Sequence, residues 1–314
     1  MSVAEIGKIC QPCVWTLHDM WAFCGSEHYA ADDISARWRA PYTTSNRASN
    51  ESGLDVSRWV WLRKKRAWQY PLQVVAPSQW LANCVRGSEL MGGWPVSVVP
   101  NVLDTEQFQP WPKALARKLL GLPENKQLVL FGAIGGGTDP RKGWDLLQGA
   151  LEALAAAHPN LECVVFGQSE PVHPPELGLP IHWLGRLNDD TTIALAYGAA
   201  DVTVVPSRQE NLPQTGTEAQ ACGCPVVAFN CTGLPDVVVH GETGYLARPY
   251  DVADLAHGIC WVLEDIARHA ALCAAARERA VRLWSPAVVV PQYLSIYQEA
   301  IDRWHKTYGQ PVNK

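Results

Sequence analysis

The sequence predicts an α/β protein whose larger part is a doubly wound parallel sheet covered by helices. Two observations support this prediction: short apolar runs recur after about Gln127, and helical stretches separate them. Such alternation is typical of a parallel sheet with helices on its faces. The predicted strands are 128–132, 161–166, 181–184, 202–205 and 226–229. The predicted helices are 142–156, 190–199, 213–221 and 252–264.

The first hundred residues also carry strands, but too few for a second complete domain of this kind. Strands are predicted at 14–17, 73–76 and 96–99, and residues from about 30 to 55 form a long irregular insert. The chain of 314 residues is long enough for two domains, each with its own core. Residues 98–110 combine a strand with a linker, so we place the domain boundary near there.

The bulk composition limits the classes of function. The net charge of −5 argues against a nucleic-acid-binding protein, which would normally carry a strongly basic face. No apolar run approaches the roughly 20 residues needed to cross a bilayer. The first residues lack the basic start and continuous apolar stretch of a signal peptide. We therefore expect a cytoplasmic protein that binds no nucleic acid.

The ten cysteines predict neither a disulfide framework nor a metal site. The close pairs are Cys10 with Cys13 and Cys222 with Cys224, and neither has a histidine or a second cysteine pair at a spacing typical of zinc. In a chain of this size without an export signal, reduced thiols that pack as small hydrophobic side chains are expected. The sequence therefore predicts no metal.

The segment 206–223 is predicted to join a strand to a helix beside an anion. An apolar strand at 201–205 precedes it, and Pro213 is well placed as the first helical residue. Glu210 would then lie in the loop before the helix, and Glu218 in its early turns. Free backbone N–H groups at a helix start bind anions, and the predicted contacts are Asn211, Leu212, Gln214 and Thr215.

The two carboxylates beside such a helix start can accept hydrogen bonds from hydroxyl groups. One carboxylate would bind the hydroxyls of a sugar, and the other would bind those of a ribose. A pair of solvated surface glutamates is the ordinary alternative. The preceding strand, Pro213 and the turn at Gly223 favour a binding site.

A second segment, residues 131–143, follows another predicted strand and is rich in glycine. Glycine lets a backbone approach a phosphate closely, and Arg141 and Lys142 stand at the start of the next predicted helix. These cations and backbone dipoles would stabilise the charge that grows on a leaving diphosphate. A solvated basic pair at a helix end is the alternative. The position after a glycine-rich strand end favours phosphate binding.

Two glutamates separated by seven residues, followed by Ala-Cys-Gly and the strand 225–229, resemble the signature of the retaining nucleotide-sugar glycosyltransferases of family 4. The resemblance extends from about residue 10 to the end, with further motifs at 15–23 and 75–81. It implies the GT-B fold, in which two Rossmann-like domains face a cleft. It also implies that the first domain is incomplete, because the glycine-rich first turn of such proteins is missing.

The resemblance suggests three parts. Residues 1–104 would be a partial acceptor-binding domain, and residues 105–285 would bind the nucleotide sugar. Residues 286–314 would form a helix that crosses back to the first domain.

The resemblance also implies roles for individual residues. Glu210 would orient the transferred sugar and stabilise positive charge at its reacting carbon, without attacking it. Glu218 would bind the ribose, and Lys142 would contact the diphosphate. The nucleobase of the donor would lie near Gly185 and Arg186.

One customary cation of the family is absent. The arginine that often follows the glycine of the strand is replaced here by Ala133. Either Arg141 or the amides of the glycine loop would compensate for it.

His18 is a candidate from the first domain, because it follows the first predicted strand. The resemblance implies that it contacts the donor sugar or assists the acceptor, and Asp19 would orient its ring. Packing of the ring against Trp15 and Trp21 is the alternative. His28 is a weaker candidate of the same kind.

These roles predict a glycosyltransferase that moves a sugar, with retention, from a nucleoside-diphosphate donor to a saccharide or lipid-linked acceptor in cell-surface polysaccharide or glycolipid assembly. The donor phosphate itself would take the acceptor's proton, so no cofactor or metal is required. Two alternatives stay open. A GT-B epimerase or hydrolase of sugar nucleotides would need a further acid or base, and an inactive nucleotide-sugar-binding remnant would explain the missing first turn.

The acceptor side is less well defined. Residues 57–68 mix aromatic and cationic side chains at helical spacing. Such a helix can be solvent-exposed on one side and packed against the protein on the other, or it can contact anionic lipid head groups at the inner membrane face.

Overall fold

The computed structural model describes residues 2–49, 51–135 and 137–309. The chain divides into two compact units, one of Met1–Asn101 with Val289–Lys314 and the other of Val102–Val288. Each unit holds its own parallel sheet and hydrophobic core. Among the described residues, no helix combines the length and the apolar character needed to span a bilayer.

The larger unit is built on a parallel sheet with the spatial order β6-β5-β4-β7-β8-β9. Its strands are β4 (Gln127–Gly132), β5 (Leu161–Phe166), β6 (Ile181–Gly185), β7 (Val202–Val205), β8 (Val226–Phe229) and β9 (Gly244–Ala247). The chain moves outward from β4 to β6 and then returns, so that β7 pairs with the other side of β4. The carboxyl ends of β4 and β7 are therefore the topological switch point, where ligands of doubly wound folds bind.

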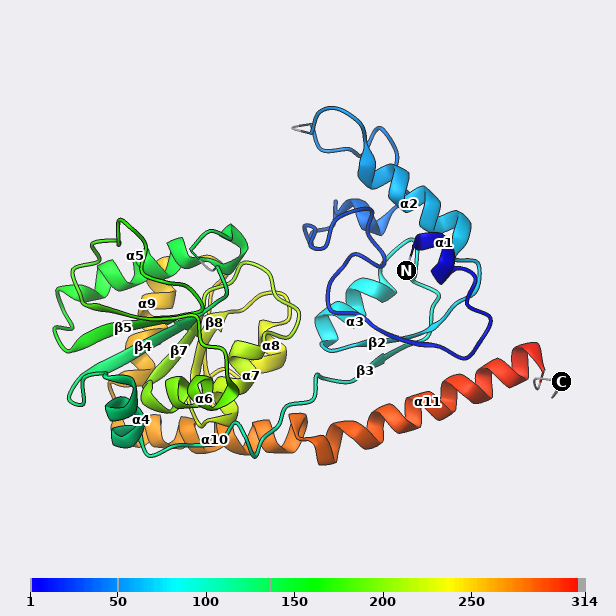
Figure 1. Ribbon diagram of the computed structural model, residues 1–314. Coiled ribbons are helices and arrows are strands. Elements are labelled where there is room, and N and C mark those ends of the chain that lie inside the picture. Colours follow the sequence, from blue (N-terminus) through cyan, green and yellow to red (C-terminus); the bar gives the residue numbers. More distant parts are fainter. Residues whose placement is uncertain (1, 50, 136, 310–314) are drawn as a thin grey trace. The chain divides into compact units, whose positions relative to one another are not determined.

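Helices cover both faces of this sheet (Figure 1). Helices α5 and α9 pack together on one face, whereas α6 and α7 cover the other, with α4 against α6 and α10 against α7. The bounds are α4 (Lys113–Leu120), α5 (Trp144–Ala155), α6 (Asp190–Ala199), α7 (Gln214–Ala221), α8 (Leu234–Val237), α9 (Val252–Leu263) and α10 (Ile266–Trp284).

The sequence accounts for these elements locally. Strands β5, β7 and β8 are buried along their whole length, as expected of continuous apolar runs in a sheet that is covered on both faces. Aspartate side chains cap the starts of α6, α9 and α10 by accepting a backbone N–H, and these residues are Asp189, Asp251 and Asp265.

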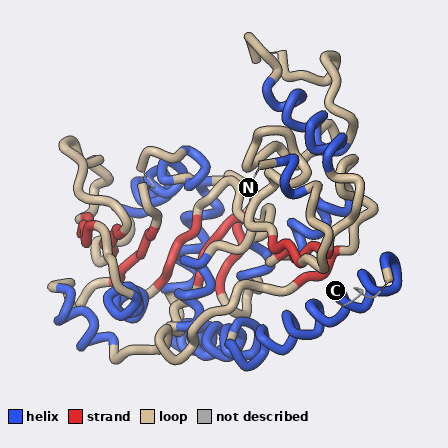
Figure 2. The backbone as a smooth tube through the Cα atoms, turned by 45° about the vertical axis from the view of Figure 1, so that its right-hand side comes forward, coloured by secondary structure: helices blue, strands red, loops and turns tan. Residues whose placement is uncertain are grey.

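The smaller unit contains a parallel sheet in the order β1-β2-β3. Its elements are α1 (Val3–Ile6), β1 (Val14–Thr16), the 3₁₀ turn η1 (Arg37–Arg39), α2 (Val56–Ala67), β2 (Gln73–Ala76), α3 (Gln79–Arg86), β3 (Val96–Val98) and most of α11 (Pro286–Tyr308). In α11, Val289 and Ile296 join Val75 and Val99 in one apolar cluster. Apart from η1, the described residues between β1 and α2 form loops and turns, which Figure 2 draws in tan. The predicted irregular insert is thus confirmed.

Every predicted strand is confirmed to within one residue. Strand β9 and helices α3, α4 and α10 lie outside the predicted elements. Strand β9 has only four residues and begins at Gly244, so its apolar pattern is too short to stand out.

Two predicted helix starts are wrong. The helix expected from Lys142 begins at Trp144, because Gly143 adopts a φ of 68° and separates α5 from the 3₁₀ turn η2 (Pro140–Lys142). Pro213 is the N-cap of α7 and not its first helical residue, since its ψ of 123° is extended.

Candidate functional site

The two segments singled out in the sequence follow the two central strands at the switch point. The glycine-rich loop follows β4, and the loop that carries Glu210 follows β7. Because β4 pairs with β7, both loops emerge at the same edge of the sheet. The structure therefore brings together residues that lie about 70 positions apart in the chain, such as Lys142 and Glu210.

Backbone contacts fix these two loops against each other. Gly143 has a φ of 68°, and a Cβ added there would lie 2.0 Å from the carbonyl oxygen of Pro206. The N–H of Arg208 donates to the carbonyl of Arg141 at 2.8 Å. Only glycine fits at position 143, and the turn that precedes it is held directly beside the loop after β7.

Glu210 is the centre of an ion-pair cluster between the loops. The residue is only 6% exposed, and its Oε1 accepts hydrogen bonds from Lys142 Nζ at 2.7 Å and from Arg141 Nη1 at 3.1 Å. A buried carboxylate is tolerated when it is paired and hydrogen-bonded, so the three side chains position one another. Arg141 and Lys142 are therefore not a freely solvated basic pair.

A fourth charge completes the cluster. Asp139 caps the turn η2 through its contact with the N–H of Arg141 at 2.9 Å, and its carboxylate also pairs with the guanidinium at 3.3 Å. Two cations, Arg141 and Lys142, thus face two carboxylates, Asp139 and Glu210. Because these charges balance, attraction of an anion to this place depends on backbone N–H groups as well.

The start of α7 supplies such groups. No side chain caps this helix, and its N-cap Pro213 carries no N–H. The N–H groups of the first turn, including Gln214 and Thr215, have no carbonyl partner within the helix. Asn211 and Leu212 are buried in the loop before it, whereas Gln214 is exposed.

A tight turn behind Glu210 holds this loop in place. The N–H of Gly233 donates to the carbonyl of Glu210 at 2.9 Å, and the N–H of Glu210 donates to Thr232 Oγ1 at 3.1 Å. A Cβ at Gly233 would lie 1.5 Å from the carbonyl oxygen of Asn211, so this approach also requires glycine.

Glu218 lies one helical turn further into α7 and has different surroundings. Its Oε2 accepts a hydrogen bond from the hydroxyl of Tyr197 on α6 at 3.0 Å. Burial raises the pKa of Glu218 to about 7. The surroundings of the two glutamates therefore differ, since Glu210 is paired with two cations and Glu218 with a neutral hydroxyl.

The glycine loop continues along the carboxyl edge toward β6. The N–H of Gly137 donates to Gln168 Oε1 at 2.8 Å, and Gln168 forms a β-bridge with Gly185 at the end of β6. Arg186 beside it is exposed. Gly136 lies outside the described residues. The predicted base contacts, Gly185 and Arg186, thus lie along the same edge as the loop.

A cavity of about 500 Å³ opens at this part of the edge. Its wall includes Gly135, Gly137, Gln168 and the indole rings of Trp144 and Trp183. Glu210 and Glu218 do not line it. The edge therefore has a pocket with aromatic and amide walls beside the glycine loop, separate from the two acids.

His18 belongs to the smaller unit, whereas all the other predicted site residues belong to the larger one. It is exposed and lies two residues beyond β1. Asp19 contacts His28 Nδ1 at 2.6 Å and accepts the N–H of Trp21 at 2.8 Å. The carboxylate predicted to orient His18 thus has His28 and Trp21 as its hydrogen-bond partners.

Three residues that shape the site were not among the sequence candidates. Tyr197 and Gln168 come from other elements, and no local pattern marks them. Asp139 is different, because an aspartate followed by Pro140 is a helix-start signal. That signal marks the separate turn before Gly143.

Known proteins resemble this chain in sequence and in fold. The sequence profile described as "Glycosyl transferases group 1" matches residues 113–279. The D-inositol 3-phosphate glycosyltransferase of Thermobispora bispora is 34% identical over 234 residues, which cover 69% of this chain and 54% of that protein. The chain spans about half the length of the curated relatives it matches.

Solved structures give the same fold. Sucrose-phosphate synthase from Thermosynechococcus elongatus matches with a TM-score of 0.67 and 28% identity, over 82% of this chain and 65% of that one. The Anabaena protein HepE, solved with UDP and glucose, matches with a TM-score of 0.62 and 22% identity, over 92% of this chain and 70% of that one. Both units are parallel-sheet α/β domains of the GT-B type. The chain therefore belongs to the glycosyl transferases group 1 family.

Proposed function

We propose that this chain transfers a glycosyl group from a nucleoside-diphosphate sugar to a saccharide or lipid-linked acceptor, with retention at the sugar carbon. The observation that carries the proposal is the cluster at the switch point, where Glu210 is held by Lys142 and Arg141 beside the uncapped start of α7. A buried acid, two cations and free amides in one place suit a sugar joined to a diphosphate.

The diphosphate of the donor would lie on the N–H groups at the start of α7 and against Lys142. Because Lys142 is already paired with Glu210, a phosphate has to share or replace that carboxylate as its partner. Glu218 would then accept hydrogen bonds from the ribose, and the base would lie near Gly185 and Arg186. The Anabaena protein solved with UDP and glucose supports a donor of this class.

The reaction we propose is a same-face displacement. The acceptor hydroxyl attacks the sugar carbon as the bond to the diphosphate breaks, and a phosphate oxygen takes the hydroxyl proton. Lys142, Arg141 and the amides of α7 stabilise the leaving charge, so we expect no metal to be required. Glu210 is held too firmly between cations to be the nucleophile, and it would instead stabilise positive charge at the reacting carbon.

For the acceptor we propose a saccharide or lipid-linked compound of cell-surface assembly, reached in the cytoplasm. The relative in Thermobispora bispora is a transferase to D-inositol 3-phosphate by its name, which is a small polar acceptor. On α2, Trp59 is 58% exposed with the Arg63 guanidinium over its ring at 4.6 Å. An exposed aromatic with basic neighbours suits contact with anionic lipid head groups.

Nucleotide binding tests the donor site. We expect calorimetric titration with UDP, GDP and ADP to show binding of at least one of them. Lys142→Ala should weaken that binding, and Lys118→Ala on the exposed face of α4 should not. Glu210→Gln should bind the nucleoside diphosphate as tightly as the wild type or more tightly, because it releases Lys142. Absence of heat with all three nucleotides would remove the donor-site assignment.

Transfer tests the reaction itself. With a panel of nucleotide sugars and lipid-linked acceptors, Glu210→Gln should slow product formation by about a hundredfold or more. The same assay is needed on a chain extended to the full length of the relatives. Binding without transfer in both forms would support the inactive remnant, and release of free sugar without an acceptor would support a hydrolase.

A further inference from the structure

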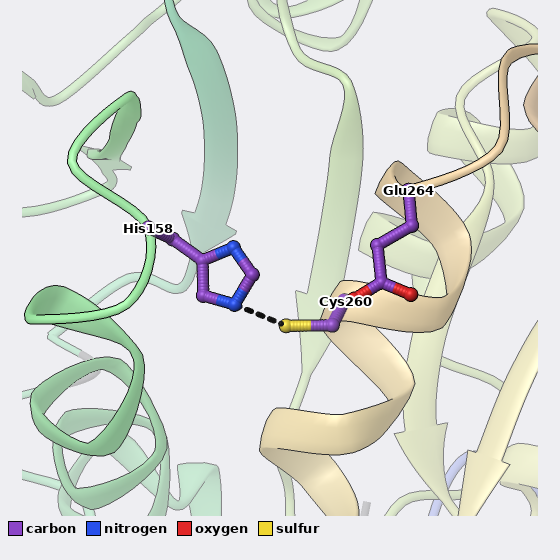
Figure 3. Close-up of side chains that lie close together, drawn as sticks. All are labelled: His158, Cys260 and Glu264. Atoms are coloured by element: carbon purple, nitrogen blue, oxygen red, sulfur yellow. Dashed lines mark hydrogen bonds between the residues drawn. The ribbon is translucent and has the colours of Figure 1, made fainter.

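A second cluster of chemically active side chains lies at the opposite edge of the large sheet. His158 precedes β5, and Cys260 and Glu264 lie at the end of α9 (Figure 3). The hydrogen bond from Gln127 Nε2, at the first residue of β4, to the carbonyl of Leu263 places the end of α9 at the amino edge of the sheet. With about 3.3 Å per residue, the six residues of β4 set this place roughly 20 Å from the switch point.

The three side chains converge on one point. The nitrogen Nε2 of His158 lies 3.2 Å from Cys260 Sγ, and the ligand atoms of all three residues lie within 4.8 Å of one another. Cys260 and Glu264 are four residues apart on α9, so both project from the same side of the helix. Within the described part of the chain, this is the one group of three such residues close enough to share an ion.

The local backbone holds the ligands in place. The N–H of His158 donates to the carbonyl of Leu154, and its carbonyl accepts from the N–H of Leu161, both at 2.9 Å. The N–H of Glu264 donates to the carbonyl of Cys260 at 2.9 Å. The cluster thus joins the loop before β5 to the last turn of α9, where the negative end of the helix dipole favours a cation.

We propose that His158, Cys260 and Glu264 bind a Zn²⁺ ion. An imidazole, a thiolate and a carboxylate are the side chains that bind zinc in proteins. Zinc–ligand bonds of about 2.0 to 2.3 Å in a tetrahedron place neighbouring ligand atoms about 3.3 to 3.8 Å apart. The histidine–cysteine distance already approaches that range, and only the flexible, exposed side chain of Glu264 has to move inward.

The site would hold the ion with three protein ligands and leave the fourth position to water. A cysteine binds zinc as its thiolate, so the thiol has to lose its proton when the ion binds. Zinc binding replaces that proton and releases it to solvent. The ion would tie α9 to the loop before β5 and stabilise the larger unit, while the proposed transfer reaction at the other edge still needs no metal.

The alternative is an ordinary packing contact between a cysteine and a histidine. Helix α10 provides one, because Cys273 Sγ lies 3.6 Å from His269 Nδ1 without a third ligand among the described residues. This pair is the matched control for the proposed site.

The test uses the full chain, freed of metal with a chelator and then titrated with Zn²⁺ by calorimetry and with Co²⁺ by absorption. We expect one zinc per chain, a rise in thermal stability with zinc, and the near-ultraviolet charge-transfer band of a thiolate bound to cobalt. Cys260→Ser should lose the band and bind zinc about a hundredfold more weakly or worse. Glu264→Gln, at an exposed position, should keep the band and bind zinc about tenfold more weakly.

Cys273→Ser should leave the band and the zinc affinity unchanged. A wild-type chain without the cobalt band would overturn the proposal. Equal zinc affinity in all variants would overturn it too, since ions would then bind elsewhere. If Cys260→Ser does not fold, the comparison of Glu264→Gln with the wild type still decides.

Discussion

At the scale of single residues, the two glutamates of the site are carboxylates under opposite influences. Glu210 is almost fully buried, but two cations lie within hydrogen-bonding distance of its Oε1. Glu218 accepts a hydrogen bond from the hydroxyl of Tyr197, and burial raises the pKa of Glu218 to about 7. A pair that looks symmetric in the sequence therefore has two different electrostatic roles.

The raised pKa of Glu218 predicts how stability depends on pH. Between its ordinary pKa of 4.5 and about 7, the folded chain keeps the proton of Glu218 and the unfolded chain releases it. Folding then takes up a proton, so this residue's contribution to stability is full below about pH 4.5 and is lost as the pH rises through about 7. In the wild type, Glu218 should lower the free energy of unfolding by at most about 1.4 kcal/mol per pH unit across this window. We expect Glu218→Gln to remove this decline.

Urea unfolding at pH values from 5 to 8 would measure this effect. Glu152→Gln on the exposed face of α5 removes the same charge and should keep the slope of the wild type. The assignment of the raised pKa to Glu218 would be wrong if Glu218→Gln and Glu152→Gln showed the same pH dependence.

At the scale of elements, the site depends on how two loops seat against each other. The turn η2 places Arg141 and Lys142, the loop after β7 places Glu210, and Gly143 lets the two backbones meet. The cluster is therefore a property of the contact between β4 and β7, and neither loop could form it alone.

Gly143→Ala should damage both stability and nucleotide binding. The new Cβ would clash with the carbonyl of Pro206, and alanine would have to adopt the left-handed backbone conformation of Gly143. Together these effects should lower the free energy of unfolding by about 2–5 kcal/mol. Gly121→Ala is the matched control, because Gly121 has a φ of 66° and no atom within 4 Å of the added Cβ. Gly121→Ala should lower the free energy of unfolding by only about 1 kcal/mol and should bind the nucleotide as tightly as the wild type.

Urea unfolding and calorimetric titration of both variants with the nucleotide bound by the wild type would measure these losses. Similar losses of stability in the two variants would mean that the loop contact at Gly143 contributes nothing beyond the backbone conformation.

At the scale of the whole molecule, the larger unit carries every predicted site residue except His18. Its two ends are tied together, because the N–H of Leu103 donates to the carbonyl of Trp284 at 2.8 Å. Arg277 of α10 donates to the carbonyls of Thr105, Phe108 and Ala221. The unit therefore has its own core, and hydrogen bonds within the unit hold its two ends together.

A fragment of residues 102–288 should fold and bind nucleoside diphosphate within about threefold of the affinity of the full chain, since domains with their own core can fold alone. Circular dichroism, thermal unfolding and calorimetric titration would measure this. A folded fragment that binds no nucleotide would show that the smaller unit supplies part of the donor site.

Many individual features follow from sequence because their causes are local. The continuous apolar runs predict the strands, and the glycine-rich loop and the pair Glu210 and Glu218 identify the family. Helix boundaries are less certain, and the starts at Lys142 and Pro213 were each wrong by one or two residues, because the conformation of one residue decides them. The short strand β9 and the alanine-rich helix α10 gave weak patterns.

The sequence by itself determined the doubly wound fold and the family, and it marked the two segments that meet at the switch point, since these depend on local periodicity and short motifs. Only the tertiary structure decided which charges meet. The ion pairs of Glu210, the hydrogen bond from Tyr197 to Glu218, and the approach of His158 to Cys260 all join residues that are far apart in the chain. Such contacts arise from the order and packing of the strands and helices, which no local pattern records.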